Sequence, residues 1–577
     1  MNKNILLCVL NAKYVHMSPA PWCLMAGVKA YAPEYLQNTQ VFQATINQPL
    51  EEIAQEIIQK SPSVVTFSCY IWNITHVLTL ANTLKKALPN VCILLGGPEV
   101  SFRAEEVLAH KDIIDFVLRG EGEESFPAFL HAYFNESQNL CDVSGIAYYN
   151  NVGTYVENPL AFNKKLPPSP LSVGYHLDLK GRISYIETSR GCPYHCAFCL
   201  SGLAGKPNYF PMKSVKDDML ALANADTRTI KFVDRTFNAN AHHANEILSF
   251  ILENYGTNIP KNVCFHFEIA GDILREETFL LLEKMPKGVV QLEIGMQSFH
   301  EPTLKAVRRV TNTEKLIRNI HRLVAMRNMH IHIDLIAGLP LEDLPTFKKS
   351  FDIGYSLHAD MLQLGFLKVL YGSQMRVEAE NFPCEFTDVP PYQVTKTPWL
   401  SKADLEVLSL VEDAVERTYN SGRFIHTLEY VTNECGLTPF DLYHHIGKWT
   451  AVQAGHPAYP LDIYIEKLQF ALQKLPGVNS VILRDMLVMD RLETNQTGRL
   501  PTCLQVQDKT RAKAYKALEA NANTKQQKNL RRGMAILYSR ESCVYVDYEK
   551  QAQDIITKRW TLHEVFLTDL LKNNEIC

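Results

Sequence analysis

The sequence predicts two consecutive α/β domains followed by a mainly helical region. Short apolar segments alternate with helical patterns from the start of the chain to about residue 135, and a second set of such units begins at Ile183. After about residue 380 the alternation gives way to helical patterns. Continuously apolar strands separated by helices are typical of a parallel sheet that is covered on both faces.

Residues 1–138 hold the first set of strands. Five apolar segments in this range are expected to form strands, at 5–10, 41–46, 64–68, 91–95 and 114–118. Helical patterns separate them, so the strands are expected to run parallel. We therefore predict a flavodoxin-like, doubly wound parallel sheet, whose ligand binds beyond the carboxyl ends of the strands.

Residues 139–180 are expected to form a linker or small insertion. The run from Leu166 to Pro170 contains three prolines, which cannot continue a helix or a central strand. The first domain is therefore expected to end before this stretch, and the second to begin after it.

Residues 181–380 hold the second set of strands. These are expected at 183–188, 229–233, 263–268, 289–294, 330–336 and 361–366. Six strand–helix units are fewer than the eight of a complete barrel. They predict a partial (β/α)6 barrel with its active site at the carboxyl ends of the strands.

Residues 381–577 form a region of unknown role. Helices are expected at about 401–419 and 460–474, and a late strand at about 541–548. The cysteines of this region are isolated, so they are not expected to form a metal-binding motif of closely spaced thiols. Its position after the barrel indicates a cap or a substrate-selecting element.

Composition and charge exclude several classes of protein. The chain has 577 residues, of which 46% are hydrophobic and 21% charged, as in ordinary globular proteins. A net charge of -4 gives no basic footprint for nucleic acid. No apolar run approaches the roughly 18 residues of a membrane-spanning helix, and the first residues do not resemble a signal peptide. We therefore expect a cytoplasmic protein that binds neither nucleic acid nor a membrane.

Three of the 14 cysteines lie within eight residues, directly after the first strand of the predicted barrel. They are Cys192, Cys196 and Cys199, in the run Gly191-Cys-Pro-Tyr-His-Cys-Ala-Phe-Cys199. Thiolates bind iron–sulfur clusters, and a [4Fe-4S] cluster normally takes four of them. Three cysteines leave one iron without a protein ligand, and an open coordination position is what a metal needs in order to activate a substrate.

A zinc knuckle is the alternative interpretation of this loop. His195 or a distant cysteine would then provide the fourth ligand. Structural zinc sites usually pair two short hooks of Cys or His, and the sequence shows no second hook. The iron–sulfur cluster is therefore the favoured prediction.

The spacing C-x3-C-x2-C, with the aromatic Phe198 before the last cysteine, closely resembles the signature of the radical S-adenosylmethionine (SAM) superfamily. This resemblance implies that Cys192, Cys196 and Cys199 hold a [4Fe-4S] cluster whose open iron binds SAM. An electron from a reductant such as flavodoxin or ferredoxin would then allow the cluster to cleave SAM and release a 5′-deoxyadenosyl radical. The three cysteines are thus the candidate catalytic and metal-ligating residues.

Further segments resemble SAM-binding parts of the same superfamily, in the order that the barrel requires. Asp234 follows the second strand, in a segment that departs from the Gly-Gly-Glu form of many members. Glu268 ends the third strand and resembles a carboxylate that helps to hold SAM in the coproporphyrinogen dehydrogenase-like branch. Arg309 matches a position that pairs with the SAM carboxylate, and a planar guanidinium suits that role.

Two more positions are implied to contact the nucleoside of SAM. Gln297 follows the fourth strand and would reach the ribose. Asp334 lies in the fifth strand and would bind the ribose hydroxyls, with the backbone of residues 336–338 along the adenine. Each residue alone is equally consistent with an ordinary polar group, but their shared placement at strand ends strengthens the set.

The first domain, taken with the cysteine motif, resembles the cobalamin (B12)-binding domain of one large radical SAM class. The likeness includes five residues at predicted carboxyl ends of strands: Ser68, Gly96, Gly97, Gly120 and Glu121. Glycine there lets the backbone approach a large cofactor closely. The Asp-x-His-x-x-Gly motif, which supplies an axial histidine to cobalt in many cobalamin proteins, is missing, and His16 is the nearest candidate. A flavodoxin-like domain kept for packing or partner contact is the alternative.

The resemblance implies a cobalamin-dependent radical SAM enzyme that transfers a methyl group to an unactivated carbon. The cofactors would perform the difficult chemistry, while the protein positions the substrate, an unknown small molecule or peptide. One alternative is an enzyme of the same class that catalyses oxidation, cyclisation or rearrangement without methylation. The other is a non-enzymatic iron–sulfur or cobalamin sensor, against which the SAM-binding motifs argue.

Overall fold

The computed structural model describes residues 3–110, 112–135, 139–451, 459–496, 499–506, 509–521, 533–549 and 551–572. The chain forms two compact units. Unit 1 comprises Met1–Leu292, Lys305–Thr311 and Leu367–Thr397, and unit 2 comprises Glu293–Leu304, Asn312–Phe366 and Pro398–Cys577. Each unit therefore contains residues that are far apart in the sequence.

Unit 1 begins with a sheet of seven strands in the order β2-β1-β3-β4-β5-β6-β7. The bounds of its first five strands are β1 Ile5–Asn11, β2 Thr39–Thr45, β3 Val64–Ser68, β4 Cys92–Gly96 and β5 Phe116–Leu118. These five are parallel, and their order is that of flavodoxin-like folds, which confirms the predicted fold class. Within residues 139–180, β6 (Ile146–Tyr149) and β7 (Tyr155–Glu157) add two antiparallel strands.

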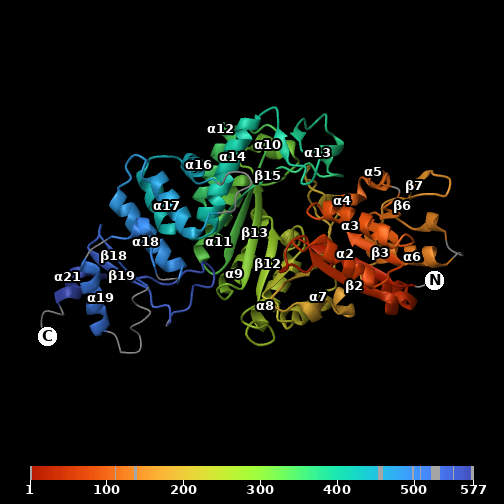
Figure 1. Cartoon of the computed structure of the whole chain (residues 1–577), viewed down its shortest axis with the longest axis horizontal. Coiled ribbons are helices and arrows are strands. Elements are labelled where there is room, and N and C mark those ends of the chain that lie inside the picture. The colour runs from red at the N-terminus through yellow and green to blue at the C-terminus, as the bar shows by residue number, and fades with distance from the viewer. Residues whose placement is uncertain are drawn as a thin grey trace. The chain divides into compact units, whose positions relative to one another are not determined.

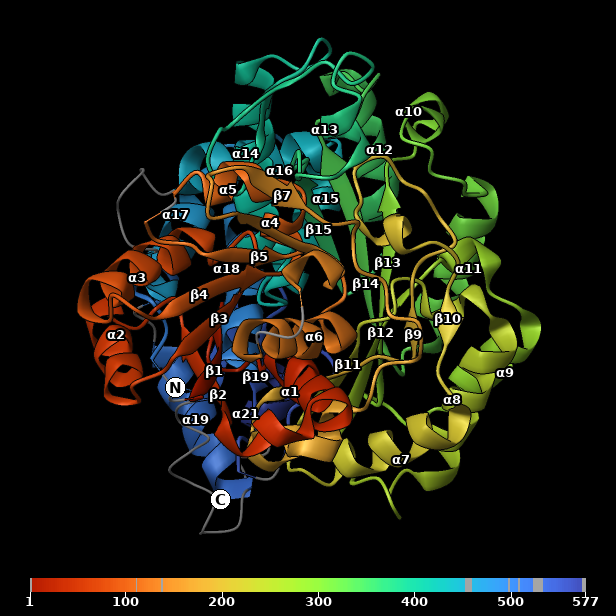
Figure 2. The same cartoon turned by 90° about the vertical axis from the view of Figure 1, so that its right-hand side faces the viewer.

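Helices cover both faces of this sheet. They are α1 Ala20–Tyr31, α2 Leu50–Gln59, α3 Ile74–Ala87, α4 Pro98–Ser101, α5 Ala104–Leu108 and α6 Gly122–Phe134. Helices α1 and α6 pack against each other, as do α2 and α3 (Figure 2). Successive side chains of β1 point to opposite faces of the sheet. On one face, Leu6, Cys8 and Leu10 belong to the hydrophobic core formed with α2 and α3. On the other face, Ile5 and Leu7 belong to the core formed with α1 and α6.

A second sheet has six strands in the order β15-β14-β13-β12-β11-β8. Strands β12, β13 and β15 of this sheet are labelled in Figure 1. Their bounds are β8 Ile183–Ile186, β11 Thr229–Phe232, β12 Cys264–Ile269, β13 Val290–Gln297, β14 His330–Ala337 and β15 Met361–Phe366. The helices of this region are α7 Met212–Ala223, α8 Ala241–Asn254, α9 Glu276–Lys284, α10 Glu301–Ala306, α11 Thr313–Met326 and α12 Leu344–Ser356. Strands β8, β11 and β12 pair in parallel, and so do β14 and β15. The succession of six strands with helices between them is the α/β pattern that the sequence predicts.

Residues 367–397 follow the last strand of the second sheet but belong to unit 1. Their short elements are α13 Gln374–Val377, β16 Glu385–Phe386 and β17 Val394–Lys396. Tyr392 is fully buried, and its hydroxyl donates a hydrogen bond to Glu99 in α4. The guanidinium groups of Arg103 and Arg376 both lie over the ring of Tyr371. This segment is therefore packed onto the first domain of the chain.

The rest of unit 2 is mainly helical, as the sequence predicts. Its helices are α14 Lys402–Val415, α15 Ile425–Glu434, α16 Pro439–Thr450, α17 Leu461–Leu472, α18 Ser480–Thr494, α19 Lys509–Asn521 and α21 Leu567–Lys572. The expected late strand is β19 (Ser542–Tyr545), which pairs with β18 (Met534–Leu537) and β20 (His563–Phe566) in an antiparallel sheet. In the part of the chain that the structure describes, no helix combines the length and the apolar character needed to span a bilayer.

Candidate functional site

The three cysteines lie in unit 1 on the cysteine loop, residues 191–199, which follows β9 (Ser189–Arg190). Gly191 opens the loop with a φ of 106°, and a Cβ there would lie 2.8 Å from the carbonyl oxygen of Gly205. Glycine alone suits both the left-handed backbone and the close contact. The N–H of Cys192 donates to the same carbonyl at 3.2 Å, which closes the base of the loop.

Ala197, inside the cysteine loop, is held by two distant segments of unit 1. Its N–H donates to the carbonyl of Val307 at 2.9 Å, and its carbonyl accepts from the N–H of Met375 at 2.9 Å. Ala197 is also completely buried. The conformation of the loop is therefore set by residues that follow it in the chain by more than a hundred positions.

Each cysteine sulfur has a polar N–H or O–H group beside it. The pairs are Cys192 Sγ with Thr236 Oγ1 at 3.5 Å, Cys196 Sγ with Arg309 Nη1 at 4.0 Å, and Cys199 Sγ with Ser201 N at 3.4 Å. Hydrogen bonds to sulfur favour the thiolate and help to set the reduction potential of an iron–sulfur cluster. Cys192 and Cys196 are buried, and Phe198 and Cys199 are half-buried. The loop is therefore suited to carry three negatively charged sulfur atoms.

Asp234, expected near SAM, is almost completely buried, and both of its carboxylate oxygens accept hydrogen bonds. Oδ1 accepts from the hydroxyls of Thr188 at 2.7 Å and Ser189 at 2.5 Å, and Oδ2 accepts from the N–H of Thr188 at 3.0 Å. His243 Nε2 lies 3.0 Å from the Thr188 hydroxyl. Burial raises the pKa of Asp234 to about 6, and these hydrogen bonds oppose the rise. The carboxylate thus anchors the strand end that leads into the cysteine loop.

Arg309 and Glu268 also lie in unit 1. The Arg309 guanidinium lies over the ring of Tyr194, 5.5 Å from its centroid, and 4.0 Å from the sulfur of Cys196. Burial raises the pKa of the Cys196 thiol, and the charge of Arg309 opposes that rise. Glu268, in β12, is half-buried, and its carboxylate lies 4.0 Å from the guanidinium of Arg235. Arg309 therefore lies directly beside the cysteine loop, and Glu268 at the end of a strand of the same unit.

A cavity of about 320 Å³ lies at the carboxyl ends of the strands of the first sheet. Its lining includes all of the residues expected to contact cobalamin, which are Ser68, Gly96, Gly97, Gly120 and Glu121. Another part of the wall comes from Glu187, Arg190 and Val233, at the ends of the strands that precede and neighbour the cysteine loop. The cavity and the loop are thus adjacent in unit 1.

Two glycines in the cavity wall are required by the backbone itself. Gly97 has a φ of 105°, and a Cβ there would lie 2.6 Å from the carbonyl oxygen of Cys69. Gly120 has a φ of 89°, and its Cβ would lie 2.2 Å from the carbonyl oxygen of Ala161. These glycines therefore bring the loops of the wall together, in addition to leaving room for a ligand.

His16, the nearest candidate for an axial cobalt ligand, is engaged elsewhere. Its Nδ1 lies 2.6 Å from the hydroxyl of Tyr185, and burial lowers the pKa of its imidazole. His16 is also absent from the described residues that line the cavity. The structure therefore gives no support to an axial histidine at this position.

In unit 2, Gln297 ends β13 with a left-handed backbone, at a φ of 70°. The hydroxyl of the next residue, Ser298, donates to Glu342 at 2.6 Å, and the hydroxyl of Ser350 donates to the same oxygen at 2.9 Å. Glu342 is fully buried, and burial raises its pKa to about 7. A left-handed backbone at a non-glycine residue costs about 1–2 kcal/mol, so neighbouring contacts must stabilise it. The buried hydrogen bonds of Ser298 and Ser350 to Glu342 stabilise the turn at Gln297.

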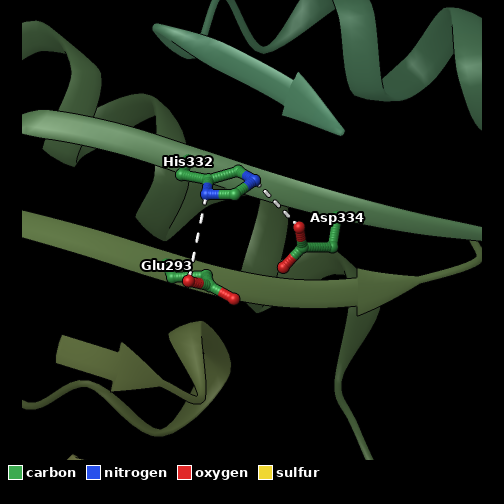
Figure 3. Close-up of side chains that lie close together, drawn as sticks. All are labelled: Glu293, His332 and Asp334. Carbon is green, nitrogen blue, oxygen red and sulfur yellow. Dashed lines mark ion pairs between the residues drawn. The ribbon is translucent and has the colours of Figure 1, made fainter. Parts of the chain in front are cut away.

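Asp334 lies in β14 beside a histidine and a second carboxylate (Figure 3). Its Oδ1 is 2.9 Å from His332 Nε2, and Nδ1 of the same imidazole is 4.0 Å from Glu293 Oε2. All three side chains are half-buried. The two nitrogens of the imidazole thus face different carboxylates. One potential ligand atom from each of the three side chains also lies within 4.8 Å of the other two, so the chain of contacts forms one compact polar cluster.

Sequence reasoning missed three residues that the structure places next to the predicted site: Arg190, Thr236 and Glu342. In the sequence, only their proximity to the motifs could have pointed to them. Arg190, for example, lies two positions before Cys192. The partners could not be identified from a pattern. Glu123, for example, binds Arg190 across a separation of 67 positions.

Three family models match consecutive parts of the chain. The model of the B12 binding domain matches residues 25–130, and that of the Radical SAM superfamily matches residues 186–351. A model described as a protein of unknown function (DUF4080) matches residues 380–566. The first two ranges contain the loops of the cavity and the cysteine loop, respectively.

The chain also resembles named proteins. It is 25% identical over 415 residues to the cobalamin-dependent radical SAM methyltransferase TokK of Streptomyces tokunonensis. The aligned region covers 67% of this chain and 59% of TokK. It is 30% identical over 298 residues to the hopanoid C-3 methylase of Methylococcus capsulatus, covering 50% and 55% of the two chains. The chain thus spans little more than half the length of these relatives. Its fold is similar to that of the radical SAM methyltransferase TsrM from Kitasatospora setae, with a TM-score of 0.55, 19% identity, and coverage of 67% and 78%.

The chain therefore contains a B12-binding domain and a radical SAM domain. The B12-binding domain lies ahead of the radical SAM domain in the sequence. The cofactors follow from these two domains and are a [4Fe-4S] cluster, SAM and cobalamin.

Proposed function

We propose that this protein is a cobalamin-dependent radical SAM methyltransferase that methylates an unactivated carbon of a small molecule or peptide. One observation carries the proposal: the cysteine loop and the cobalamin-type cavity belong to one unit, and Glu187 and Arg190, just before the loop, line that cavity. Among the relatives are named methyltransferases, which supports methyl transfer. A reductant of the flavodoxin or ferredoxin type supplies the electron.

The residues present fit the two metal cofactors. Cys192, Cys196 and Cys199 hold the [4Fe-4S] cluster and leave one iron open for SAM. The loops after β3, β4 and β5 hold cobalamin, through Ser68, Gly96, Gly97, Gly120 and Glu121. When bound, the cluster supplies the one-electron cleavage of SAM, and cobalamin supplies the methyl carrier.

SAM is held by groups that match its parts. The planar guanidinium of Arg309 pairs with the SAM carboxylate, and Glu268 pairs with the amino group. The resemblance of their motifs supports Gln297 and Asp334 of unit 2 as residues that would contact the ribose, and residues 336–338 as backbone that would contact the adenine. Because the carboxylate of Asp234 is used by Thr188 and Ser189, its segment contributes its backbone to the amino group rather than a side chain.

The test is anaerobic reconstitution of the full chain with iron, sulfide, hydroxocobalamin, SAM and a reductant. Mass spectrometry is expected to detect both 5′-deoxyadenosine and S-adenosylhomocysteine. Cys196→Ala removes a cluster ligand and is expected to abolish both products. Cys435→Ala, at a buried cysteine outside the loop, is the matched control and is expected to retain them.

The two products separate the alternatives. Deoxyadenosine without S-adenosylhomocysteine would contradict methyl transfer and would indicate oxidation, cyclisation or rearrangement. If neither product formed from protein that carries its cluster, the enzymatic proposal would be wrong and a sensor would be favoured. Products that persist in Cys196→Ala would contradict the assignment of the cluster ligands.

A further inference from the structure

The Arg190 guanidinium, two residues before Cys192, contacts three carboxylates. It donates to both oxygens of Glu187, at 2.8 and 2.7 Å, and to both oxygens of Glu123, at 2.9 and 3.3 Å. A third carboxylate, that of Glu121, lies 3.5 Å away. The side chain of Arg190 is 21% exposed and that of Glu123 only 7%, so water screens these pairs weakly.

The donors of Arg190 match the acceptors around it. A guanidinium carries five N–H groups in one plane. Glu187 accepts hydrogen bonds from the Nε hydrogen and from one Nη2 hydrogen. Glu123 accepts from the other Nη2 hydrogen and from one Nη1 hydrogen. One Nη1 hydrogen is left for Glu121. A lysine ammonium is a point charge with three donors, and it cannot chelate two carboxylates in this way.

The carboxylates lie on two separate loops. Glu187 precedes the cysteine loop, whereas Glu121 and Glu123 belong to residues 119–123, here called the cobalamin-type loop. That loop connects the end of β5 to the start of α6, and it lines the cavity. Asn163 braces it further, with its N–H 2.5 Å from Glu121 and its side-chain amide 2.9 Å from Glu123. Arg190 is thus the group through which the cobalamin-type loop is bonded to the strand that leads into the cysteine loop.

The pairing with Glu123 keeps a buried charge in place. Burial raises the pKa of Glu123, but Arg190 outweighs this effect and holds that pKa below its usual range. Loss of the guanidinium would leave three carboxylates facing one another without a cation between them, which is strongly unfavourable. The two loops would then be expected to separate or to admit water.

We infer that Arg190 is a positioning residue that fastens the cobalamin-type loop to the cysteine loop, and so fixes the two metal cofactors relative to each other. The inference rests on the proposed function, because only that function requires both cofactors at once. The inference predicts that a change in the cobalamin-type loop alters the EPR spectrum of the cluster. It also predicts that a change beside the cluster alters the affinity for cobalamin.

The test compares Arg190→Lys, Glu123→Gln and a control in the full chain, reconstituted anaerobically with iron, sulfide and hydroxocobalamin. The control is Arg182→Lys, since Arg182 lies just before β8, is 12% exposed, and pairs with Asp178 at 3.5 Å. Two quantities are measured on each protein. They are the dissociation constant of hydroxocobalamin by absorbance and the EPR spectrum of the reduced cluster, normalised to the iron content.

Arg190→Lys and Glu123→Gln are each expected to weaken hydroxocobalamin binding by about 10-fold, since each breaks charge-assisted hydrogen bonds. Both are expected to change the EPR spectrum of the cluster. Arg182→Lys is expected to leave both quantities as in the wild type. The double variant is expected to be no worse than either single variant, because one interaction is lost in all of them.

The decisive result is the cluster spectrum of Glu123→Gln, since Glu123 belongs to the cobalamin-type loop. A spectrum identical to that of the wild type would overturn the inference, even if Arg190→Lys changed it. This comparison stands alone if Arg190→Lys does not fold. A wild-type protein that took up no cobalamin would overturn the proposed function first, and the inference with it.

Discussion

Thr236 places its hydroxyl 3.5 Å from the sulfur of Cys192, in the segment that Asp234 anchors. A hydroxyl that donates to a cluster thiolate stabilises the more negative, reduced state of the cluster. The carbonyl of Arg235 also accepts from this hydroxyl, at 2.8 Å, so the two acceptors compete for one proton. The charge of a cluster thiolate favours the sulfur once the cluster is bound.

Thr236→Val is therefore expected to lower the reduction potential of the cluster. One hydrogen bond is worth about 1 kcal/mol, which corresponds to about 40 mV for a one-electron couple. A redox titration followed by EPR measures the midpoint. Thr236→Ser keeps the hydroxyl and is the control; equal midpoints for the Val and Ser variants would show that the hydroxyl does not reach the sulfur.

Glu342 gives a dependence of stability on pH. Burial raises its pKa from the ordinary 4.5 to about 7, so the folded protein holds this proton more tightly than the unfolded chain does. The stabilisation is complete below pH 4.5 and is lost as the pH rises to about 7. A shift of this size corresponds to at most about 3 kcal/mol of unfolding free energy.

Glu342→Gln is expected to remove this loss. Urea unfolding between pH 4.5 and 7 measures the effect, and the wild type is expected to lose more stability over this interval than the variant. Glu301→Gln, at an exposed position of α10, is the control and should keep the wild-type slope. An unchanged slope in Glu342→Gln would show that another group titrates there.

The cysteine loop shows how an element can be predicted in part. Its spacing identified three thiols with a common purpose, and the structure gathers them on one loop of unit 1. The strands of both sheets could also be predicted, because continuous apolar runs mark buried parallel strands. Strands β6 and β9 were not predicted, because residues 146–149 lie in the expected linker and residues 189–190 lie between an expected strand and the cysteine motif. The contacts that hold Ala197 could not be predicted either, because they join backbone groups and leave no trace in residue type.

Gly191→Ala is expected to prevent the loop from forming. The left-handed backbone alone costs a non-glycine residue about 1–2 kcal/mol, and the Cβ would also press on the carbonyl of Gly205 at 2.8 Å. Iron bound per chain after reconstitution is expected to fall sharply.

Gly205→Ala is the matched control. Its φ of 77° brings the same kind of strain, but a Cβ there meets nothing within 4 Å. It is expected to lower stability slightly and to keep the iron. Equal iron loss in both variants would mean that strain, rather than the contact at Gly191, governs the loop.

At the scale of the whole molecule, the boundaries of the sequence families and those of the compact units differ. The DUF4080 match begins at residue 380, yet residues 367–397 belong to unit 1. Tyr392 is the clearest link, because it bonds to Glu99 across 293 positions of the chain and is fully buried. Burial raises the pKa of Glu99, so its carboxylate depends on such partners. The first domain is therefore completed by residues that any cut at a family boundary would remove.

Tyr392→Phe is expected to destabilise the protein by about 1–3 kcal/mol, because it leaves a buried carboxylate without one of its donors. Tyr371→Phe is the control in the same segment. Its hydroxyl lies 3.0 Å from Glu106 at an exposed position, so its loss is expected to cost well under 1 kcal/mol. Thermal unfolding of the two variants measures the difference, and similar midpoints would contradict the proposed link.

The attachment of Ala197 to Val307 and Met375 has a consequence for the order of events during protein synthesis. The ribosome delivers the three thiols long before it adds either of the backbone groups that lock them. A nascent chain therefore exposes these thiols while they are still free to rearrange. Iron that binds at that stage would bind a loop that has not yet adopted its final conformation. Iron that binds after release would bind a loop that Val307 and Met375 already hold.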